Sequence, residues 1–228
     1  MARTARELLE TTTGTLAPDP QANRLVPLVA RGAAGRDTLA ALALEQRWVI
    51  AADRRAFAYL AHRTAETPRT AAYFTALAEG EAVAGQRLEA FVEACGVDEA
   101  RSVAYTPLPG CQAYPAYVAW LALNGSPAET VLALHANFSA WGGYCATIAG
   151  ALRRHYGFSD EACGFFDLFA APDPELEHRT TAAVQEGLDA GHLSEDLVRR
   201  YGLLLQSYER MFWHTLWESD RGRAGQVD

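Results

Sequence analysis

Residues 201–216 read YGLLLQSYERMFWHTL, and their spacing decides what this part of the chain becomes. Successive residues of an α-helix lie about 100° apart around its axis. On that wheel five large apolar or aromatic residues fall on one arc: Tyr201, Leu205, Tyr208, Phe212 and Leu216. Glu209 falls inside the same arc. We therefore predict a long helix that packs on a core and turns one carboxylate toward it.

The same helical spacing continues outward through the chain, divided by residues that start or stop helices. Proline favours the first helical position, Ser and Asp favour the N-cap, and glycine favours the position after the C-cap. Residues 126–129, SPAE, have the pattern of a capping box. We expect helices to start at Asp37, Pro68, Tyr114, Ser126, Ser159, Asp173 and Ser194, and to end near Thr67, Gly96, Asn124, Gly157 and Ser219.

No alternating strand pattern, internal repeat or low-complexity linker interrupts these helices. The chain is therefore expected to form one all-α domain, a bundle of about seven or eight helices. We expect this domain to span residues 25–219. Residues 1–24 contain the segments TTTGT and PDP, which favour a loosely attached, flexible N-terminal arm, and residues 220–228 are expected to form a C-terminal tail.

The composition narrows the class of function. Half of the 228 residues are hydrophobic, the formal net charge is −8 and no basic run occurs, so we expect neither nucleic acid nor a membrane as a partner. All 20 basic residues are arginine, which excludes a Schiff-base lysine and the lysine of a phosphate-binding loop. The four cysteines show no CxxC spacing, and no apolar segment approaches the roughly 20 residues of a membrane span. We expect a soluble, cytoplasmic protein with reduced thiols.

Two further helices place polar residues on apolar faces. Glu45 lies among apolar positions of the first long helix, and Asp53 lies near the edge of the same arc. Asn137 shares a face with Trp141 in the helix that starts at Ser126. A buried carboxylate or amide is costly unless it has hydrogen-bond partners. These groups therefore either bond to one another within the core or line a cavity for a polar ligand, and the aromatic residues beside them favour the cavity.

Two motifs connect the chain with a known family. The segment SPAET occupies residues 126–130, and the last helix contains Y-E-x-x-F-W at residues 208–213. In these motifs, and in the spacing of its long helices, the chain resembles the TenA/thiaminase II family, whose members have the heme-oxygenase-like helical fold. The resemblance covers roughly residues 37–218. It implies that fold and a homo-oligomeric protein, either a dimer or a tetramer.

The resemblance also implies roles for particular residues. Family members of the thiamin-salvage type hold an aminopyrimidine between aromatic side chains, and they cleave its exocyclic bond with a cysteine nucleophile and a glutamate. Glu209 matches the catalytic glutamate, with Tyr208 beside it, and Tyr114 matches a tyrosine of the pocket. Trp141 and Phe169 match positions at which the family has tyrosines.

The pyrimidine-binding aspartate of the family has no single counterpart. The helix spacing places Gln46, beside Glu45, closest to it, whereas a shifted register selects Asp53. The expected catalytic residues are therefore Glu209 and Glu45. The expected substrate-binding residues are Gln46, Asp53, Tyr114, Asn137, Trp141, Phe169 and Tyr208.

The chain departs from the family at the position of the nucleophile. Asn137 occupies the position of the cysteine, and an amide cannot attack a pyrimidine carbon as a thiolate does. Cys145 lies two turns farther along the same helix and is expected to be a small core residue. A branch of the family lacks this cysteine and is associated with hydrolysis of aminopyrimidine amides, or deamination, through carboxylates. The chain resembles that branch more than the cysteine-containing members.

Three functions are compatible with these residues. The first is a cysteine-independent hydrolase of an aminopyrimidine-like compound in thiamin-related salvage, and the second is a ligand-binding or regulatory protein without catalysis. The third is a di-iron oxidase of the same superfold, which needs several Glu, His and Asp ligands, but Glu81 has no histidine one or two turns later. Heme oxygenase activity needs a histidine near the start of the first long helix, where none occurs. We expect a hydrolase without a metal or other cofactor.

Overall fold

The computed structural model describes residues 3–19, 21–191 and 193–224, and every regular element within them is helical. This confirms the predicted all-α fold. The elements are α1 (Ala5–Thr15), α2 (Leu25–Ala30), α3 (Arg36–Arg63), α4 (Pro68–Ala94), α5 (Glu99–Ala104), α6 (Pro109–Asn124), α7 (Pro127–Ala151), a π-helical turn (Leu152–Tyr156), α8 (Asp160–Ala170), α9 (Pro174–Asp189) and α10 (Glu195–Ala224).

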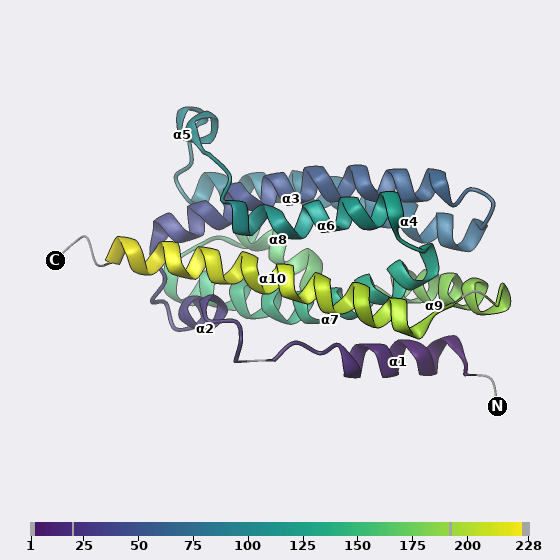
Figure 1. Cartoon of the computed structure of the whole chain (residues 1–228). Helices are drawn as coiled ribbons and strands as arrows, with labels where there is room; N and C mark the ends of the chain where they lie inside the picture. The colour runs from purple at the N-terminus through teal and green to yellow at the C-terminus, as the bar shows by residue number, and fades with distance from the viewer. Residues whose placement is uncertain (1–2, 20, 192, 225–228) are drawn as a thin grey trace.

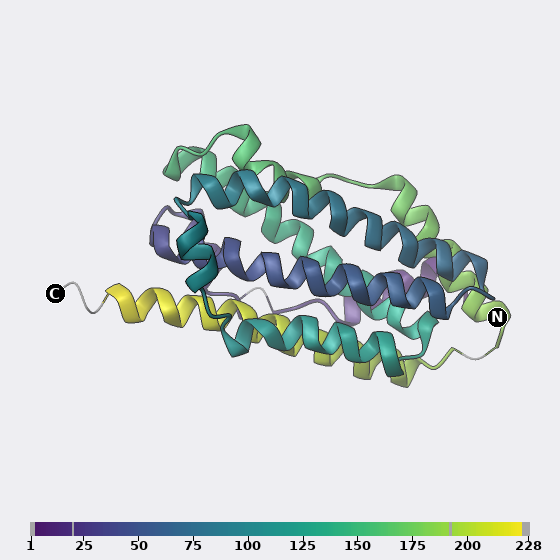
Figure 2. The ribbon, with the colours of Figure 1, turned by 90° about the horizontal axis from the view of Figure 1, so that it is seen from above.

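The long helices run roughly along one axis and form a bundle (Figure 1). Helices α3 and α4 form an antiparallel hairpin, and seen from above α3 lies between α4 and α6 (Figure 2). Helix α10 packs against α6 and α7, and α7 also packs against α8. The short helix α5 projects from one end of the bundle (Figure 1). Each long helix is thus covered by neighbours on two or more sides.

The buried apolar residues form two clusters. One cluster lies on the side of α8 and includes Phe91 and Phe166, and we call it the α8 cluster. The other includes Phe57 and Val184, and we call it the α9 cluster because α9 contributes to it. Burial of apolar surface in these two clusters is the main favourable contribution to folding.

Five helices cross from one cluster to the other, and each has a polar residue at the crossing. On α10, Glu209 lies between Leu205 of the α9 cluster and Phe212 of the α8 cluster. The equivalent residues on α3, α4, α6 and α7 are Asp53, Glu81, Tyr114 and Asn137. The bundle therefore contains a polar layer, formed by these five residues, between two apolar clusters.

The N-terminal segment differs from the expected flexible arm. The Thr4 hydroxyl accepts a hydrogen bond from the Glu7 amide, and the Glu7 carboxylate accepts one from the Thr4 amide, so α1 begins with a capping box. Leu8 and Leu9 are buried in the α9 cluster, and α1 contacts α7 and α9. The expectation of a loosely attached arm is therefore wrong for α1. Its buried residues Ala5, Leu8, Leu9 and Thr12 follow the i, i+3, i+4, i+7 spacing of a helix that packs on a core, although the TTTGT segment is polar. Residues 1, 2 and 20 of the expected arm lie outside the described residues.

Local sequence signals locate several helix ends correctly. Ser159 and Asp173 cap α8 and α9 as expected, and Gly157 follows the π-helical turn with a φ of 72°. Other ends differ: Gly35, not Asp37, is the N-cap of α3, and α6 begins before Tyr114. Helix α10 continues through residues 220–224, which were expected to belong to a tail, and the rest of that tail lies outside the described residues.

Two helix starts are capped by carboxylates of other helices. At the start of α3, Asp220 of α10 accepts hydrogen bonds from the Gly35 amide at 2.8 Å and the Thr38 hydroxyl at 2.6 Å. At the start of α4, Glu186 of α9 accepts one from the Thr70 amide at 2.8 Å. The first amides of a helix lack partners within the helix, and its dipole favours negative charge there. These bonds join distant parts of the chain.

The SPAE segment does not form the expected capping box. The Ser126 side chain makes no capping hydrogen bond to α7. Glu129 instead accepts a hydrogen bond at 2.8 Å from the amide of Ser194, the residue that precedes α10. Glu129, which belongs to α7, therefore accepts a hydrogen bond at the start of α10.

The described residues form ten α-helices and one π-helical turn, more than the seven or eight expected. The additional elements α1, α2 and α5 have 11 residues or fewer, and short helices give a weak periodic signal. In the described part of the chain, no helix has both the length and the apolar character that crossing a membrane requires.

Candidate functional site

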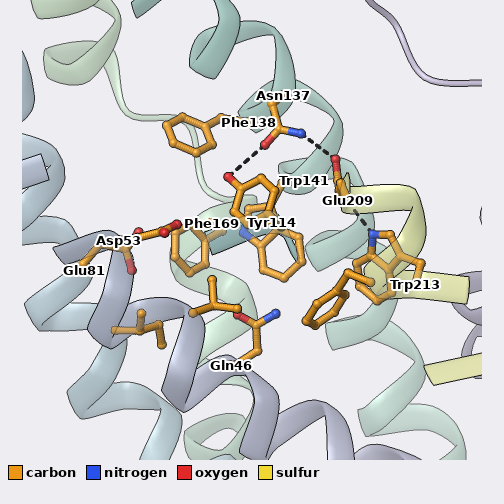
Figure 3. Close-up of a pocket in the computed structure, with 13 residues that line it drawn as sticks. Gln46, Asp53, Glu81, Tyr114, Asn137, Phe138, Trp141, Phe169, Glu209 and Trp213 are labelled. Carbon is orange, nitrogen blue, oxygen red and sulfur yellow. Dashed lines mark hydrogen bonds between the residues drawn. The ribbon is translucent and has the colours of Figure 1, made fainter. Parts of the chain in front are cut away.

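A cavity of about 60 Å³ lies at the level of the polar layer, between the α8 cluster and the α9 cluster (Figure 3). Its lining comes from α3, α4, α6, α7, α8 and α10. This space corresponds to roughly four to six water molecules, since one water needs about 10 to 15 Å³ on the same measure. It is smaller than the roughly 150 Å³ of an engineered protein cavity that binds benzene, so a single six-membered ring is the largest ring system that suits it, and the lining side chains must move apart to admit one.

A chain of hydrogen bonds crosses one side of the cavity (Figure 3). The Tyr114 hydroxyl donates to Asn137 Oδ1 at 3.1 Å, and Asn137 Nδ2 donates to Glu209 Oε2 at 2.5 Å. The Trp213 indole N–H donates to Glu209 Oε1 at 3.1 Å. Both carboxylate oxygens of Glu209 are therefore held by donors, which fixes the orientation of the carboxyl group.

The environment of Glu209 sets its protonation. Burial raises the pKa of Glu209 to about 7, although the hydrogen bonds from Trp213 and Asn137 act to lower it. A carboxyl group with a pKa near neutrality can both accept and donate a proton at physiological pH. Glu209 therefore has the properties of an acid/base residue.

Two carboxyl groups lie on the opposite side of the cavity from Glu209 (Figure 3). Asp53 of α3 and Glu81 of α4 are neighbours there, and Asp53 Oδ1 is buried with no hydrogen-bond partner. Burial raises the pKa of Asp53 well above its ordinary value, with a further contribution from the charge of Glu81, and burial raises the pKa of Glu81 to about 8. Asp53 is buried and Glu81 is half-buried, and two carboxyl groups this close to each other share a proton near neutral pH.

Aromatic rings form much of the remaining wall. The ring centroids of Trp141 and Trp213 are 5.8 Å apart with an interplanar angle of 31°, and Phe169 meets Trp141 edge-on at 5.8 Å. Phe138 and Phe212 also line the cavity. Flat apolar walls of this kind favour a planar ligand.

Most of the residues expected from the sequence lie in this one cavity. Those that line it are Gln46, Asp53, Tyr114, Asn137, Trp141, Phe169 and Glu209. Both alternatives for the pyrimidine-binding position are present, since Gln46 and Asp53 lie two turns apart on α3 and face the same space.

Glu45 and Tyr208 do not line the cavity. Glu45 accepts hydrogen bonds at 2.6 Å each from the Tyr105 hydroxyl, the Leu108 amide and the Gln112 side-chain amide, so it anchors the loop before α6 and the first turn of α6. Glu45 therefore does not line the cavity with Glu209, contrary to the expectation from its apolar arc. Its face of α3 is covered by α6, and the cavity faces the next position around the helix.

Tyr208 belongs to a different environment from its neighbour Glu209. Its ring packs against Tyr117 of α6 at 5.2 Å between centroids. One residue corresponds to about 100° around a helix, which turns Tyr208 toward α6 while Glu209 faces α7. The expected substrate contact of Tyr208 has no counterpart in this geometry.

The sequence interpretation did not assign six of the lining residues to the site: Val49, Ile50, Glu81, Phe138, Phe212 and Trp213. Glu81 is the most informative of them. It and Asp53 lie at similar distances from the turn that joins α3 to α4, and such positions face each other in an antiparallel hairpin. That pairing could have predicted from the sequence that Glu81 faces Asp53. The aromatic residues gave no such indication, because their spacing fits a core position as well as a position on the cavity wall.

The sequence suggests two alternative chemistries, one based on the Cys145 thiol and one based on a metal ion. Cys145 is fully buried in the α8 cluster and does not line the cavity, and burial raises the pKa of its thiol well above the ordinary value. Over residues 3–19, 21–191 and 193–224, no group of three or more His, Cys, Asp or Glu side chains is arranged to hold a metal ion.

Solved structures of other proteins have a similar fold. The chain is similar to a domain of unknown function with a heme oxygenase-like fold from Shewanella denitrificans (13% identity, TM-score 0.67, covering 94% of this chain and 90% of that one). It is also similar to a TenA family transcription regulator from Silicibacter sp. (13% identity, TM-score 0.67, 92% and 96%) and to a TenA homologue from P. horikoshii (18% identity, TM-score 0.65, 94% and 96%). At these identities the likeness shows the heme-oxygenase-like fold alone.

No curated protein matches the chain. The pattern of the TENA/THI-4/PQQC family, however, matches residues 24–219, which is most of the sequence and includes every residue that lines the cavity. The chain therefore belongs to the TENA/THI-4/PQQC family.

Proposed function

We propose that the protein binds a single-ring heteroaromatic compound of the aminopyrimidine type in the cavity and hydrolyses an amide or amine bond attached to it. The observation that supports this most directly is Glu209, a buried carboxyl group with a pKa of about 7 whose two oxygens are held by Asn137 and Trp213. A residue held in this way is suited to proton transfer at neutral pH.

The walls of the cavity suit a planar ring. The faces of Trp141 and Tyr114 provide aromatic surface, and the buried side-chain amide of Gln46 can donate to and accept from ring nitrogens. The small volume favours one ring with short substituents over a two-ring compound such as thiamin.

The proposed reaction uses water as the nucleophile. Glu209 takes a proton from a water molecule as the water oxygen bonds to the carbonyl carbon, and it then returns the proton to the departing amine nitrogen as the C–N bond breaks. A cysteine route has no support in this cavity, because Asn137 stands where the family has its nucleophile and no cysteine lines the space.

A side-by-side assay tests the proposal. Thiamin, aminopyrimidine and formylaminopyrimidine are each incubated with the wild type, with Glu209→Gln and with Glu218→Gln, an exposed control on the same helix. We expect turnover of the formyl compound by the wild type and by Glu218→Gln, and a loss of about 100-fold or more in Glu209→Gln. Efficient cleavage of thiamin, or turnover that survives Glu209→Gln, would contradict the proposal.

A second function, ligand binding without catalysis, is favoured by one observation. Asn137 Nδ2 and the Trp213 indole already donate to both oxygens of Glu209, as expected of a carboxylate that only supports a binding site. One similar protein is described as a transcription regulator. Binding of aminopyrimidine with no turnover of any of the three compounds would select this function.

A further inference from the structure

The proposed hydrolysis uses Glu209 and leaves the two carboxyl groups across the cavity without a role. We propose that Asp53 and Glu81 form a cation-recognition pair, which binds a positively charged nitrogen group of the aminopyridinium or amidinium type at the end of the ligand opposite Glu209. This inference rests on the proposed ring-binding cavity, and it adds the charge and the orientation of the ligand.

The hydrogen-bond inventory of the cavity supports the pair as a ligand site. Asp53 is 3% exposed, and its Oδ1 has no partner although nearly all buried polar atoms have one. The Tyr114 hydroxyl, the phenolic donor that α6 contributes to the lining, is already bonded to Asn137. A buried, unpaired acceptor on the wall of a cavity is costly, and a donor on the molecule that occupies the cavity removes that cost.

The charges around the pair favour a cationic ligand over an anionic one. The lining groups that can carry charge are Asp53 on α3, Glu81 on α4 and Glu209 on α10, and all three are acidic. The polar groups that face them from α3, α6 and α7 are Gln46, Tyr114 and Asn137, which are neutral, and α8 contributes only an aromatic ring. With no arginine in the described lining to balance it, the cavity attracts a cation and repels an anion.

The shared proton gives the site a measurable signature. Near neutral pH the pair retains a proton, because burial raises the pKa of both groups and two adjacent carboxylates repel each other. A bound cation stabilises the ionised form, so its arrival displaces that proton to solvent. Charge-assisted N–H···O bonds to the carboxylates then replace the missing partner of Asp53.

The position of the pair also orients the ligand. Because Asp53 and Glu81 lie on one side of the cavity and Glu209 lies on the other, a ring whose cationic nitrogen meets the pair presents its opposite edge to Glu209 (Figure 3). The ligand class is therefore a planar single ring with a basic nitrogen at one end and the reacting substituent at the other.

Two probes of equal size separate charge from shape. 4-Aminopyridine is cationic at neutral pH, and aniline is a neutral ring with the same number of heavy atoms. Titration calorimetry at pH 7, in two buffers of different ionisation enthalpy, measures affinity and proton release together. The variants are Asp53→Asn, Glu81→Gln and, as a matched control, Glu79→Gln, which changes an exposed carboxylate two residues away on α4.

We expect the wild type and Glu79→Gln to bind 4-aminopyridine at least about tenfold more tightly than aniline, with release of close to one proton. Asp53→Asn and Glu81→Gln should lose both the preference and the proton release, while circular dichroism shows that they remain folded. Affinity for the cation should also rise between about pH 6 and 8, as the pair loses its proton.

Three results would overturn the inference: equal affinity for the two probes, no binding of either, or a preference that persists in both Asp53→Asn and Glu81→Gln. Tight binding of Mn²⁺ or Zn²⁺ that depends on the same two residues would also overturn it, because the pair would then be a metal site. The hydrolysis assay with Glu209→Gln is independent of these measurements. If the hydrolysis assay shows no catalysis, the preference for a cationic ligand can still be observed. If the preference is absent, the proposed role of Glu209 is unaffected.

Discussion

Glu209 can be buried in an apolar bundle because neighbouring side chains donate hydrogen bonds to it and because its carboxyl group can be neutralised by protonation. Asn137 and Trp213 satisfy its oxygens, and burial raises its pKa to about 7, so that both protonation states are accessible near neutral pH. The group is therefore neither a fixed charge nor a fixed neutral side chain. Its protonation follows pH in the physiological range, and two measurable consequences come from that property.

The first consequence concerns stability. The pKa of Glu209 is raised in the folded protein, so between about pH 4.5 and 7 the folded state binds more protons than the unfolded state, and the free energy of unfolding falls as pH rises. Relative to Glu209→Gln, the wild type should lose roughly 3 kcal/mol across this window. Urea denaturation of both proteins at several pH values, with Glu218→Gln as control, measures the difference. Parallel curves for the wild type and Glu209→Gln would contradict it.

The second consequence concerns Asn137. Its hydrogen bond to Glu209 lowers the pKa of that carboxyl group, so Asn137→Ala should raise the pKa of Glu209 further. Carbon-13 titration of labelled glutamate would detect the shift. Tyr114→Phe is the matched control, because the Tyr114 hydroxyl contacts Asn137 rather than Glu209 and its removal should change the pKa less. A lower pKa of Glu209 in Asn137→Ala would show that solvent replaces the amide.

The residue scale also shows what a helical wheel can and cannot locate. It identified Glu209, Asn137 and Asp53, since each interrupts an apolar arc. It misplaced Glu45, because an arc drawn from one helix does not reveal which neighbour covers it, and α6 rather than the cavity covers that face. The wheel did not assign Glu81 to the site, because the place of Glu81 in the cavity depends on how α4 packs against α3, and the pattern of α4 alone does not contain that information.

At the scale of whole helices, capping shows the same division between local and distant information. Ser159 and Asp173 cap the helices they precede, and the sequence predicts both correctly. Asp220 and Glu186 cap α3 and α4 from other helices, at sequence separations of 185 and 116 residues respectively. No local pattern predicts such bonds, because their partners become neighbours only after the bundle has formed.

Asp220 offers a test of capping at a distance. Asp220→Ala should reduce the free energy of unfolding by about 1 kcal/mol, since two donors at the start of α3 lose their acceptor. Glu218→Ala, an exposed site on the same helix, is the control. Hydrogen exchange should localise the effect to the first turn of α3. Exchange that increases equally along all of α10 would instead mean that the substitution destabilises its own helix.

At the scale of the molecule, the polar layer divides the core into the α8 cluster and the α9 cluster. A continuous apolar core would be more stable, because buried carboxyl groups without full partners oppose folding. Sequence periodicity predicts the all-α class and the long helices, but the alignment of five polar residues at one level depends on how the helices pack. The layer is consistent with a bundle that gives up some stability for a binding site.

Replacing the cation-recognition pair with apolar residues should therefore stabilise the protein. Asp53→Leu combined with Glu81→Leu removes an unpaired buried acceptor and connects the two clusters across α3 and α4. We expect the free energy of unfolding at pH 7 to rise by about 1 to 4 kcal/mol, with loss of 4-aminopyridine binding. Urea denaturation and calorimetry measure the two effects. A decrease in stability would show that the carboxyl groups stabilise the native bundle.

The four native cysteines can report how the helix bundle opens, without the introduction of a label. Cys95, Cys111, Cys145 and Cys163 lie on or next to α4, α6, α7 and α8, all are free and buried, and burial raises the pKa of every one of their thiols. Iodoacetamide reacts with exposed thiolate, so alkylation at pH 8 should be slow in the native protein and rapid for all four in urea. Mass spectrometry of the peptides would give the order in which they react. Simultaneous reaction would mean that the bundle opens as one unit, whereas early reaction of one cysteine would identify the helix that separates first.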